Sequence, residues 1–309
     1  MSGVVELCCG YGGATAGMLA AGFTIEASYD LWPVAVEQHR RWHPEVPCEV
    51  RDVATITPDE LAGRLVWASL PCQPWSTANR YTEKRGKRHP HYYSLAHFAR
   101  QVQDARCALI ENVPGLVHTK DGQAELRELE RECARLGLSM SVHLVYSHWF
   151  GVNQWRRRAF IVIGRDVPLV LIQPGSPTRM ESEWAITATE GKGGPGRIRL
   201  NNAVTCNPAG ENTHSSVRER VMPLTVTAAE KTHERHRAVY ASESDTMSST
   251  DPRTREVNFQ GRTLAYCAEL QGCPVPEGVT KTDGYTLVGN CVPPLLAESI
   301  ARQVFGSLA

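Results

Sequence analysis

Cys72 is the residue of this chain best placed to act as a nucleophile. An apolar run over residues 65–70 predicts a buried strand, and this strand stops at Pro71, the residue directly before Cys72. In an open α/β sheet the carboxyl end of a strand faces the ligand crevice. A polar, basic stretch over residues 80–91 follows, and positive surroundings favour thiolate over thiol. Cys72 is therefore a candidate for covalent catalysis, the alternative being a small buried hydrophobic residue.

Two further segments carry groups that could work beside such a thiolate. Glu111 ends the apolar run 107–110, and burial there disfavours a carboxylate, so that a protonated acid could donate to a heterocycle's ring nitrogen. Its plainer role is to cap a turn before Pro114. In Gln154-Trp-Arg-Arg-Arg158 the arginines can hold a phosphate or a carboxylate.

A glycine turn, Gly10-Tyr-Gly-Gly13, lies between a predicted strand and a helix of small residues. This arrangement presents free backbone N–H groups to nucleotide-like ligands, although a simple tight turn uses the same residues. Asp30 ends the second predicted strand, where an acid commonly accepts ribose hydroxyls or caps the next helix. Asp52, after a third strand, is either an adenine contact or a turn acid.

Strands and helices alternate up to residue 164, which predicts an α/β protein with a Rossmann-like, doubly wound, mostly parallel sheet. The amino-acid composition changes over residues 165–283, where Gly, Pro, Ser, Thr and Asn accumulate between short β-like runs. We expect a smaller, irregular β-rich second domain there, the alternative being a disordered linker. Residues 283–289 return to strand-like apolarity before an amphipathic closing helix. The expected domains are thus 1–164 with 284–309, and 165–283.

His39 and His43 lie four residues apart on a predicted helix, a spacing that fits a metal site. No third ligand is evident in the sequence. We therefore expect a solvated helix end and no metal.

Composition narrows the class of protein. The 33 basic and 33 acidic residues balance, so the chain has no net positive charge that would attract a nucleic acid. A local basic patch could still contact phosphates. The 10 cysteines are scattered, and without a signal peptide they indicate a reduced, cytoplasmic protein. No apolar run approaches the roughly 18 residues of a membrane helix. We expect a soluble monomer.

Taken in order, these motifs resemble those of the cytosine-C5 DNA methyltransferase family over nearly the whole chain. The glycine turn resembles the family's cofactor turn. Four further segments match family motifs: Pro71-Cys72-Gln73, Glu111-Asn112-Val113, Gln154-x-Arg156-x-Arg158 and Gly289-Asn290-x-Val292-Pro293. The resemblance implies the S-adenosylmethionine-dependent methyltransferase fold, with the last motif folded back beside the cofactor.

The resemblance also implies the chemistry. Cys72 would add to C6 of cytosine, Glu111 would bind N3 and the exocyclic amine, Arg158 would contact the base carbonyl, and Arg156 would hold loop and acid in place. The residues implied for S-adenosylmethionine are Leu7, Gly10, Tyr11, Gly12, Gly13, Asp30, Leu31, Asp52, Val53, Pro71, Asn290 and Val292.

Double-stranded DNA is the implied partner, with the target base flipped out of the helix and residues 165–283 reading the sequence. The residues implied for DNA contact are Gln73, Ser76, Arg80, Lys84, Arg85, Lys87, Arg88, Gln154, Thr225 and Thr227. The enzyme would suit a restriction–modification system. The alternatives are an RNA cytosine-C5 methyltransferase and a catalytically silent DNA-binding relative.

The chain departs from the family pattern at the first strand. The family usually has Asp-Leu-Phe, with the aromatic ring packed on adenine, whereas this chain has Glu6-Leu7-Cys8. Tyr11 or Trp32 is the expected substitute for that aromatic surface.

Overall fold

The computed structural model describes residues 3–76, 85–152, 154, 156–165 and 263–308. Of the expected DNA contacts, Arg80, Lys84, Thr225 and Thr227 lie outside these ranges. No helix in the described part of the chain combines the length and apolarity needed to cross a bilayer.

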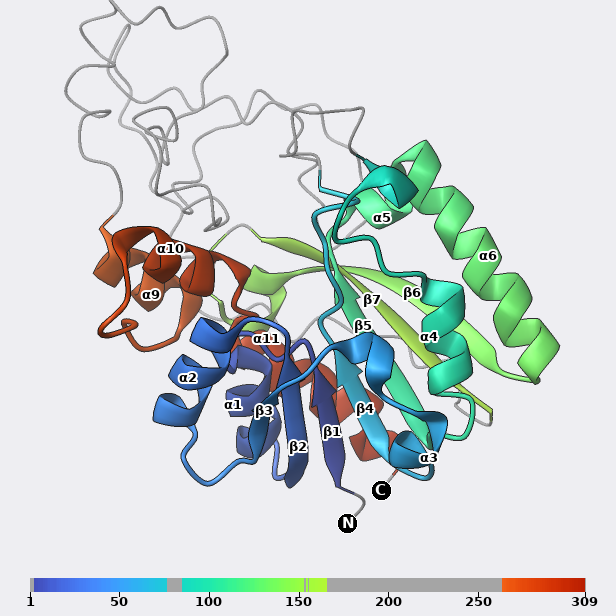
Figure 1. The fold of residues 1–309 in the computed structure, drawn as a ribbon, viewed down its shortest axis with the longest axis horizontal. Coiled ribbons are helices and arrows are strands. Elements are labelled where there is room, and N and C mark those ends of the chain that lie inside the picture. The colour runs from blue at the N-terminus through green and yellow to red at the C-terminus, as the bar shows by residue number, and fades with distance from the viewer. Residues whose placement is uncertain (1–2, 77–84, 153, 155, 166–262, 309) are drawn as a thin grey trace, which may run out of the picture.

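A mixed seven-stranded sheet forms the centre of the molecule (Figure 1). Its strands are β1 (Val4–Leu7), β2 (Ile25–Asp30), β3 (Cys48–Val50), β4 (Leu65–Ala68), β5 (Cys107–Asn112), β6 (Ser139–Tyr146) and β7 (Arg157–Gly164). In space they follow the order β3-β2-β1-β4-β5-β7-β6, and only β7 runs antiparallel to its neighbours. The predicted α/β, mostly parallel sheet is therefore confirmed.

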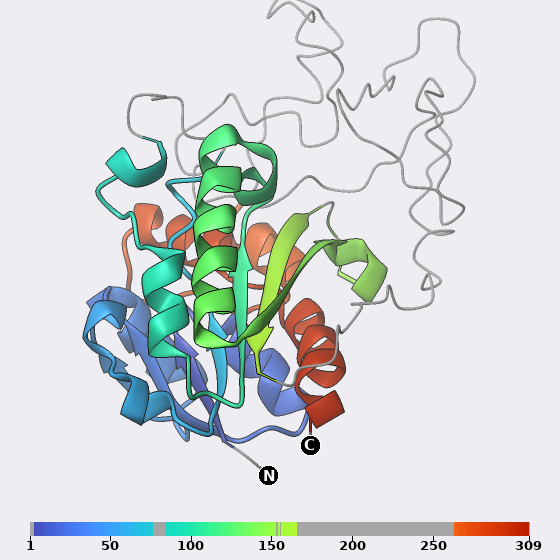
Figure 2. The same cartoon turned by 90° about the vertical axis from the view of Figure 1, so that its right-hand side faces the viewer.

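Helices cover both faces of the sheet. The helices of the described residues are α1 (Gly13–Ala20), α2 (Pro33–Trp42), α3 (Pro58–Leu61), α4 (Leu95–Gln101), α5 (Gly115–His118), α6 (Lys120–Leu136), α9 (Leu264–Gln271), α10 (Lys281–Asn290) and α11 (Pro294–Val304), of which α9 and α10 pack on each other. One core joins the sheet to α1 and α11, and a second joins it to α3, α4 and α6. Figure 2 shows α4 and α6 on one side of the sheet and α11 on the other.

The segment 283–289 is helical, so its prediction as a strand is wrong. It forms most of α10, which begins after Thr280, whose side-chain oxygen accepts a hydrogen bond from the Asp283 N–H. The apolar residues that suggested a strand, such as Tyr285 and Val288, pack instead against α9. A threonine cap followed by an acid in the first turn specifies a helix start more strongly than a short apolar run specifies a strand.

The predicted second domain, residues 165–283, lies mostly outside the described residues. Its last part does not: α9 packs on α10 through Cys267, Leu270 and Tyr285. This contact joins α9 to the helices that follow it, and the division of the chain into two domains stays a prediction.

Candidate active site

Chain segments from two adjacent strands meet where the strand order reverses. β1 lies between β2 and β4, and Leu7 at its end pairs with Ala68 at the end of β4. The Ser69 N–H donates to the Leu7 carbonyl at 3.0 Å, which extends the pairing one residue further. The glycine turn and Cys72 therefore leave the sheet side by side, at the crevice where open α/β sheets bind ligands.

The loop that carries Cys72 is anchored to the end of β5. The side-chain amide of Asn112 donates to the Leu70 carbonyl at 3.2 Å, and the Trp75 N–H donates to the Cys72 carbonyl at 3.0 Å. An ideal Cβ on Gly115 would lie 1.8 Å from the Trp75 carbonyl oxygen, so only glycine permits this approach. These contacts fix the nucleophile loop beside Glu111.

Glu111 and Arg158 face each other across β5 and β7. Arg158 Nε lies 2.8 Å from Glu111 Oε1, and the two side chains are only 12% and 9% exposed. The antiparallel pairing of the strands places Glu111 opposite Phe160. Arg158 lies two residues before Phe160 on β7, so its side chain points to the same face of the sheet as that of Phe160. A charge-assisted contact with little solvent holds the carboxylate in a defined orientation.

The thiol of Cys72 responds to both groups. Burial raises the pKa of Cys72, the Arg158 guanidinium opposes that rise, Glu111 adds to it, and Arg156 also opposes it. The expectation that positive surroundings favour the thiolate is therefore only partly met, since desolvation outweighs the arginines. The proton of Cys72 must leave before the sulfur can attack.

Gln154, expected to contact DNA, is fully buried in the described structure. Its amide donates to the Leu270 carbonyl at 3.0 Å and to the Gln271 side chain, and Gln271 in turn donates to the Cys291 carbonyl. These bonds connect the segment before β7 to α9 and to the last motif. The assignment of Gln154 as a DNA contact is thus not supported. Gln271 is a positioning residue that the sequence did not single out.

Arg156 supports the same region. Its side chain is buried, and Nη1 donates to the Gly289 carbonyl at 3.3 Å. Burial and the neighbouring Arg158 lower the pKa of Arg156. Arg156 therefore links the segment before β7 to the last motif, and its role in the reaction stays a prediction.

The glycine turn is held by Asp30 on one side and the last motif on the other. Asp30 accepts hydrogen bonds from the Gly10 and Trp32 N–H groups, both at 2.8 Å, so it orients the turn and also the start of α2. An ideal Cβ on Gly13 would lie 2.0 Å from the Val292 carbonyl oxygen. This proximity places the last motif beside the turn, as the resemblance implied.

The surroundings of the turn fit S-adenosylmethionine. An ideal Cβ on Gly10 would meet no atom within 4 Å, so there is open space above the turn. Leu31 is 63% exposed and offers an apolar surface next to Asp30, and Asn290 is exposed at the end of α10. A carboxylate at this position can accept the ribose hydroxyls of an adenosyl ligand, and an apolar side chain can pack on its adenine.

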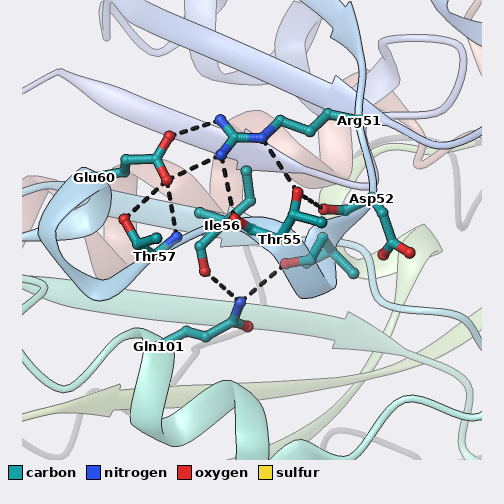
Figure 3. A network of polar contacts seen from close by, with 8 residues as sticks. Arg51, Asp52, Thr55, Ile56, Thr57, Glu60 and Gln101 are labelled. Atoms are coloured by element: carbon teal, nitrogen blue, oxygen red, sulfur yellow. Dashed lines mark hydrogen bonds and ion pairs between the residues drawn. The ribbon is translucent and has the colours of Figure 1, made fainter.

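A polar network fixes the Asp52–Val53 segment (Figure 3). Gln101, which the sequence did not single out, donates to the carbonyls of Val53 at 2.9 Å and Ile56 at 2.6 Å. The Asp52 carboxylate accepts from the Ala54 N–H at 2.9 Å and points away from the Arg51 guanidinium. Asp52 is therefore a turn acid in this structure, and its contact with adenine stays a prediction.

Tyr11 does not supply the missing aromatic surface, which corrects one of the two expectations. Its side chain is buried, its hydroxyl donates to the Pro274 carbonyl at 3.2 Å, and its ring centroid lies 5.1 Å from that of Trp42. Trp32 is half-buried at the start of α2. Cys8 itself has a φ of 54°, a left-handed conformation that is rare outside glycine.

Among the expected DNA contacts, Gln73, Lys87 and Arg88 are exposed, while Ser76 and Arg85 are half-buried. Lys87 Nζ lies 2.7 Å from a carboxylate oxygen of Glu128 on α6. An exposed ion pair of this kind contributes little to stability, so Lys87 can exchange Glu128 for a phosphate.

His39 and His43 are both buried, so the prediction of a solvated helix end is wrong. His43 Nε2 donates to the Gly12 carbonyl at 2.9 Å. Burial and the nearby His39 lower the pKa of His43 to about 4, which keeps it neutral. The two histidines therefore face the glycine turn. Their spacing along one helix did not predict this contact, because the turn belongs to another part of the chain.

Comparison with known proteins agrees with this arrangement. The family model described as C-5 cytosine-specific DNA methylase matches residues 3–306. M.MthTI of Methanothermobacter thermautotrophicus, a type II methyltransferase, is 24% identical over 96% of this chain and 94% of its own length. M.NgoMIV of Neisseria gonorrhoeae, also a type II methyltransferase, is 25% identical over 98% and 97%. The match to M.AgeI of Thalassovita gelatinovora is 29% identical but spans only 52% of this chain and 39% of M.AgeI.

Solved structures share the fold at low sequence identity. The Entamoeba histolytica methyltransferase EhMeth has a TM-score of 0.67 and 14% identity over 100% of this chain and 99% of its own. A Spodoptera frugiperda DNMT2 variant has a TM-score of 0.64 and 16% identity over 99% and 100%.

Proposed function

Because the chain belongs to the C-5 cytosine-specific DNA methylase family, we propose that it methylates C5 of cytosine in duplex DNA, with S-adenosylmethionine as the methyl donor. The observation that carries the proposal is the convergence of Cys72, Glu111 and Arg158 at the crevice edge of the sheet. Its type II methyltransferase relatives, which align along nearly their whole length, favour DNA over RNA as substrate.

Cys72 performs the covalent step. C5 of cytosine is a poor nucleophile, and addition of the Cys72 sulfur to C6 makes C5 enamine-like. Bound S-adenosylmethionine supplies the methyl group. Solvent water can take the C5 proton, and the carbon–sulfur bond then breaks to release the methylated cytosine and Cys72 as a thiolate, which regains a proton from solvent.

Glu111 and Arg158 stabilise the charge that this addition creates. As sulfur adds to C6, negative charge develops toward N3 and the carbonyl oxygen of the base. When the base binds, a proton shared between the Glu111 carboxyl group and N3 offsets that charge, and the Arg158 guanidinium orients Glu111 and faces the carbonyl. Both groups are nearly buried, where such interactions are stronger than in water.

DNA binding would combine two parts of the chain. Gln73, Lys87 and Arg88 lie on the exposed rim after Cys72, where positive side chains can contact phosphates. Residues 165–283 would form the target-recognition domain. A cytosine inside a duplex cannot reach the Cys72 crevice, so it must be flipped out. We also propose that the protein is a cytoplasmic monomer.

The test is methyl transfer from labelled S-adenosylmethionine to mixed-sequence duplex DNA and, separately, to transfer RNA, followed by base-resolution sequencing. Label on DNA cytosines within one short motif supports the proposal. Label on RNA alone contradicts the assignment of DNA as substrate. Tight DNA binding without label on either substrate would identify a silent relative. Cys72→Ala should abolish methyl transfer. The matched control is Cys133→Ala, which changes a buried cysteine on α6.

A further inference from the structure

Two cysteines and a histidine that the proposed reaction does not use meet in one buried cluster. Cys9 follows β1, His39 lies on α2, and Cys48 begins β3. One ligand atom from each lies within 4.8 Å of the others, and all three residues are buried. Figure 1 shows α2 beside β3, which is an edge strand of the sheet.

The two sulfurs are separated by a distance that suits a shared metal ion. Cys9 Sγ and Cys48 Sγ lie 3.6 Å apart. Two thiolates bound at about 2.3 Å to a tetrahedral zinc ion lie about 3.8 Å apart. A disulfide would instead require about 2.05 Å between the sulfurs. The backbone thus holds the cysteines near the spacing that a metal ion would require.

His39 presents one ring nitrogen to this cluster. Its Nε2 lies 2.8 Å from the Thr15 hydroxyl, and that hydroxyl donates to the buried Glu6 carboxylate. Because the Thr15 proton points to Glu6, the Thr15 oxygen accepts from His39 Nε2–H, which leaves the lone pair on Nδ1. Nδ1 is buried and accepts no hydrogen bond from an N–H or O–H group of the described residues, and the His39 ring interacts with the Cys48 thiol.

The hydrogen bonds that run from His39 through Thr15 to Glu6, here called the relay, resemble those around metal-binding histidines. A metal-binding histidine usually gives its other ring N–H to a group that fixes the tautomer, often one linked to a carboxylate. Packing alone explains two buried thiols. It does not explain why an imidazole whose other nitrogen is held by Thr15 meets both thiols in one buried cluster.

We propose that Cys9, His39 and Cys48 bind one thiophilic metal ion, Zn²⁺ or Cu(I). Thiolate and imidazole are the ligands that both ions favour. The three protein ligands satisfy trigonal Cu(I), and they leave one position of a tetrahedral zinc for water. The ion joins β1, α2 and β3.

The position of Cys9 gives the ion a structural role. Cys9 directly precedes Gly10, and its N–H donates to the Tyr29 carbonyl at 3.0 Å. A metal bond to its sulfur would hold the start of the glycine turn against α2. The ion therefore stabilises the turn without taking part in the reaction of Cys72.

The first test measures bound metal in the full chain, purified under reducing conditions without a metal-affinity step and then loaded with Zn²⁺ or with Cu(I). Elemental analysis after desalting should find about one equivalent of one ion in the wild type. Cys9→Ala and Cys48→Ala should each lose it, whereas Cys133→Ala should keep it. A wild type that retains neither ion, or variants that bind as much as the wild type, would overturn the proposal.

A second measurement needs no ligand variant and so survives any folding defect. X-ray absorption of the loaded wild type should show two sulfur ligands and a histidine nitrogen. A spectrum without sulfur, or a Cys9–Cys48 disulfide in non-reducing peptide maps of the protein as purified, would contradict the assignment. Thr15→Val, which keeps the shape but removes the relay, should weaken metal affinity about 10–100-fold in competition with a chromophoric chelator. An unchanged affinity would exclude the relay.

Discussion

Arg158 Nε lies 2.8 Å from Glu111 Oε1, and these two groups act on the Cys72 thiol with opposite signs. The guanidinium favours the thiolate and the carboxylate disfavours it. Substitutions at the two positions should therefore shift the reactivity of Cys72 in opposite directions, although both should impair methyl transfer.

Glu111→Gln removes the negative charge that raises the pKa of Cys72. Alkylation of Cys72 by iodoacetamide at fixed pH should become faster, while single-turnover methyl transfer should fall about 10²–10³-fold because charge on the base loses its partner. Peptide mass spectrometry gives the first rate and labelled cofactor the second. A methylation rate equal to that of the wild type would exclude the proposed role of Glu111.

Arg158→Gln removes the largest opposing influence on the same thiol. The pKa of Cys72 should rise further, so its alkylation at fixed pH should slow, in contrast to the Glu111→Gln variant. Faster alkylation in the Arg158 variant would mean that the ion pair does not control this thiol.

The raised pKa of Cys72 also predicts a pH profile. Below the pKa of a thiol, the thiolate fraction increases about tenfold for each pH unit. Since the folded pKa lies above the ordinary value, alkylation of free enzyme should continue to rise beyond about pH 8.5, where an ordinary thiol begins to level off. A plateau near neutral pH would show an activated thiolate and contradict the described balance of burial and charge.

Gly13→Ala should damage the cofactor turn. The added Cβ would lie 2.0 Å from the Val292 carbonyl oxygen, a backbone atom that cannot rotate away. Overpacking of this kind costs about 1–3 kcal/mol, and we expect weaker S-adenosylmethionine binding by calorimetry. Gly306→Ala is the control, because its Cβ would meet no atom within 4 Å. Equal affinities for both variants would disprove the contact between the turn and the last motif.

Gln271→Ala should leave the buried Gln154 amide without one acceptor and the Cys291 carbonyl without its donor. Unsatisfied buried groups cost about 1–3 kcal/mol each, so chemical denaturation should show a clear loss of stability. Gln123→Ala, on the exposed face of α6, should change the free energy of unfolding by less than about 0.5 kcal/mol. Equal losses would contradict the proposed positioning role.

The sequence predicted residues whose placement follows from topology. Cys72 and Asp30 stand at the ends of parallel strands, and the ends of such strands share one edge of the sheet. The sequence did not predict that Gln154 is buried, or that Gln271 completes its network. Those outcomes depend on the docking of α9 against a segment more than a hundred residues earlier.

The same reason explains the histidines. On the helix alone, His39 has only His43 within ligand spacing, and the sequence therefore predicted no metal site. The cluster with Cys9 and Cys48 arises because β1, β2 and β3 pair and α2 folds over them. Long-range packing of this kind leaves no local pattern that a sequence reading can detect.

The most direct test of the account is whether Cys72 bonds covalently to the target base. Duplex DNA that contains 5-fluorocytosine at the methylated position should trap the adduct, because fluorine cannot leave C5 as the proton does. With S-adenosylmethionine, covalent catalysis by Cys72 predicts a denaturation-resistant complex in which mass spectrometry finds the DNA attached to Cys72. Cys72→Ala should form no such complex. Trapping at another residue, or methylation of ordinary DNA by the Cys72→Ala variant, would contradict covalent catalysis by Cys72.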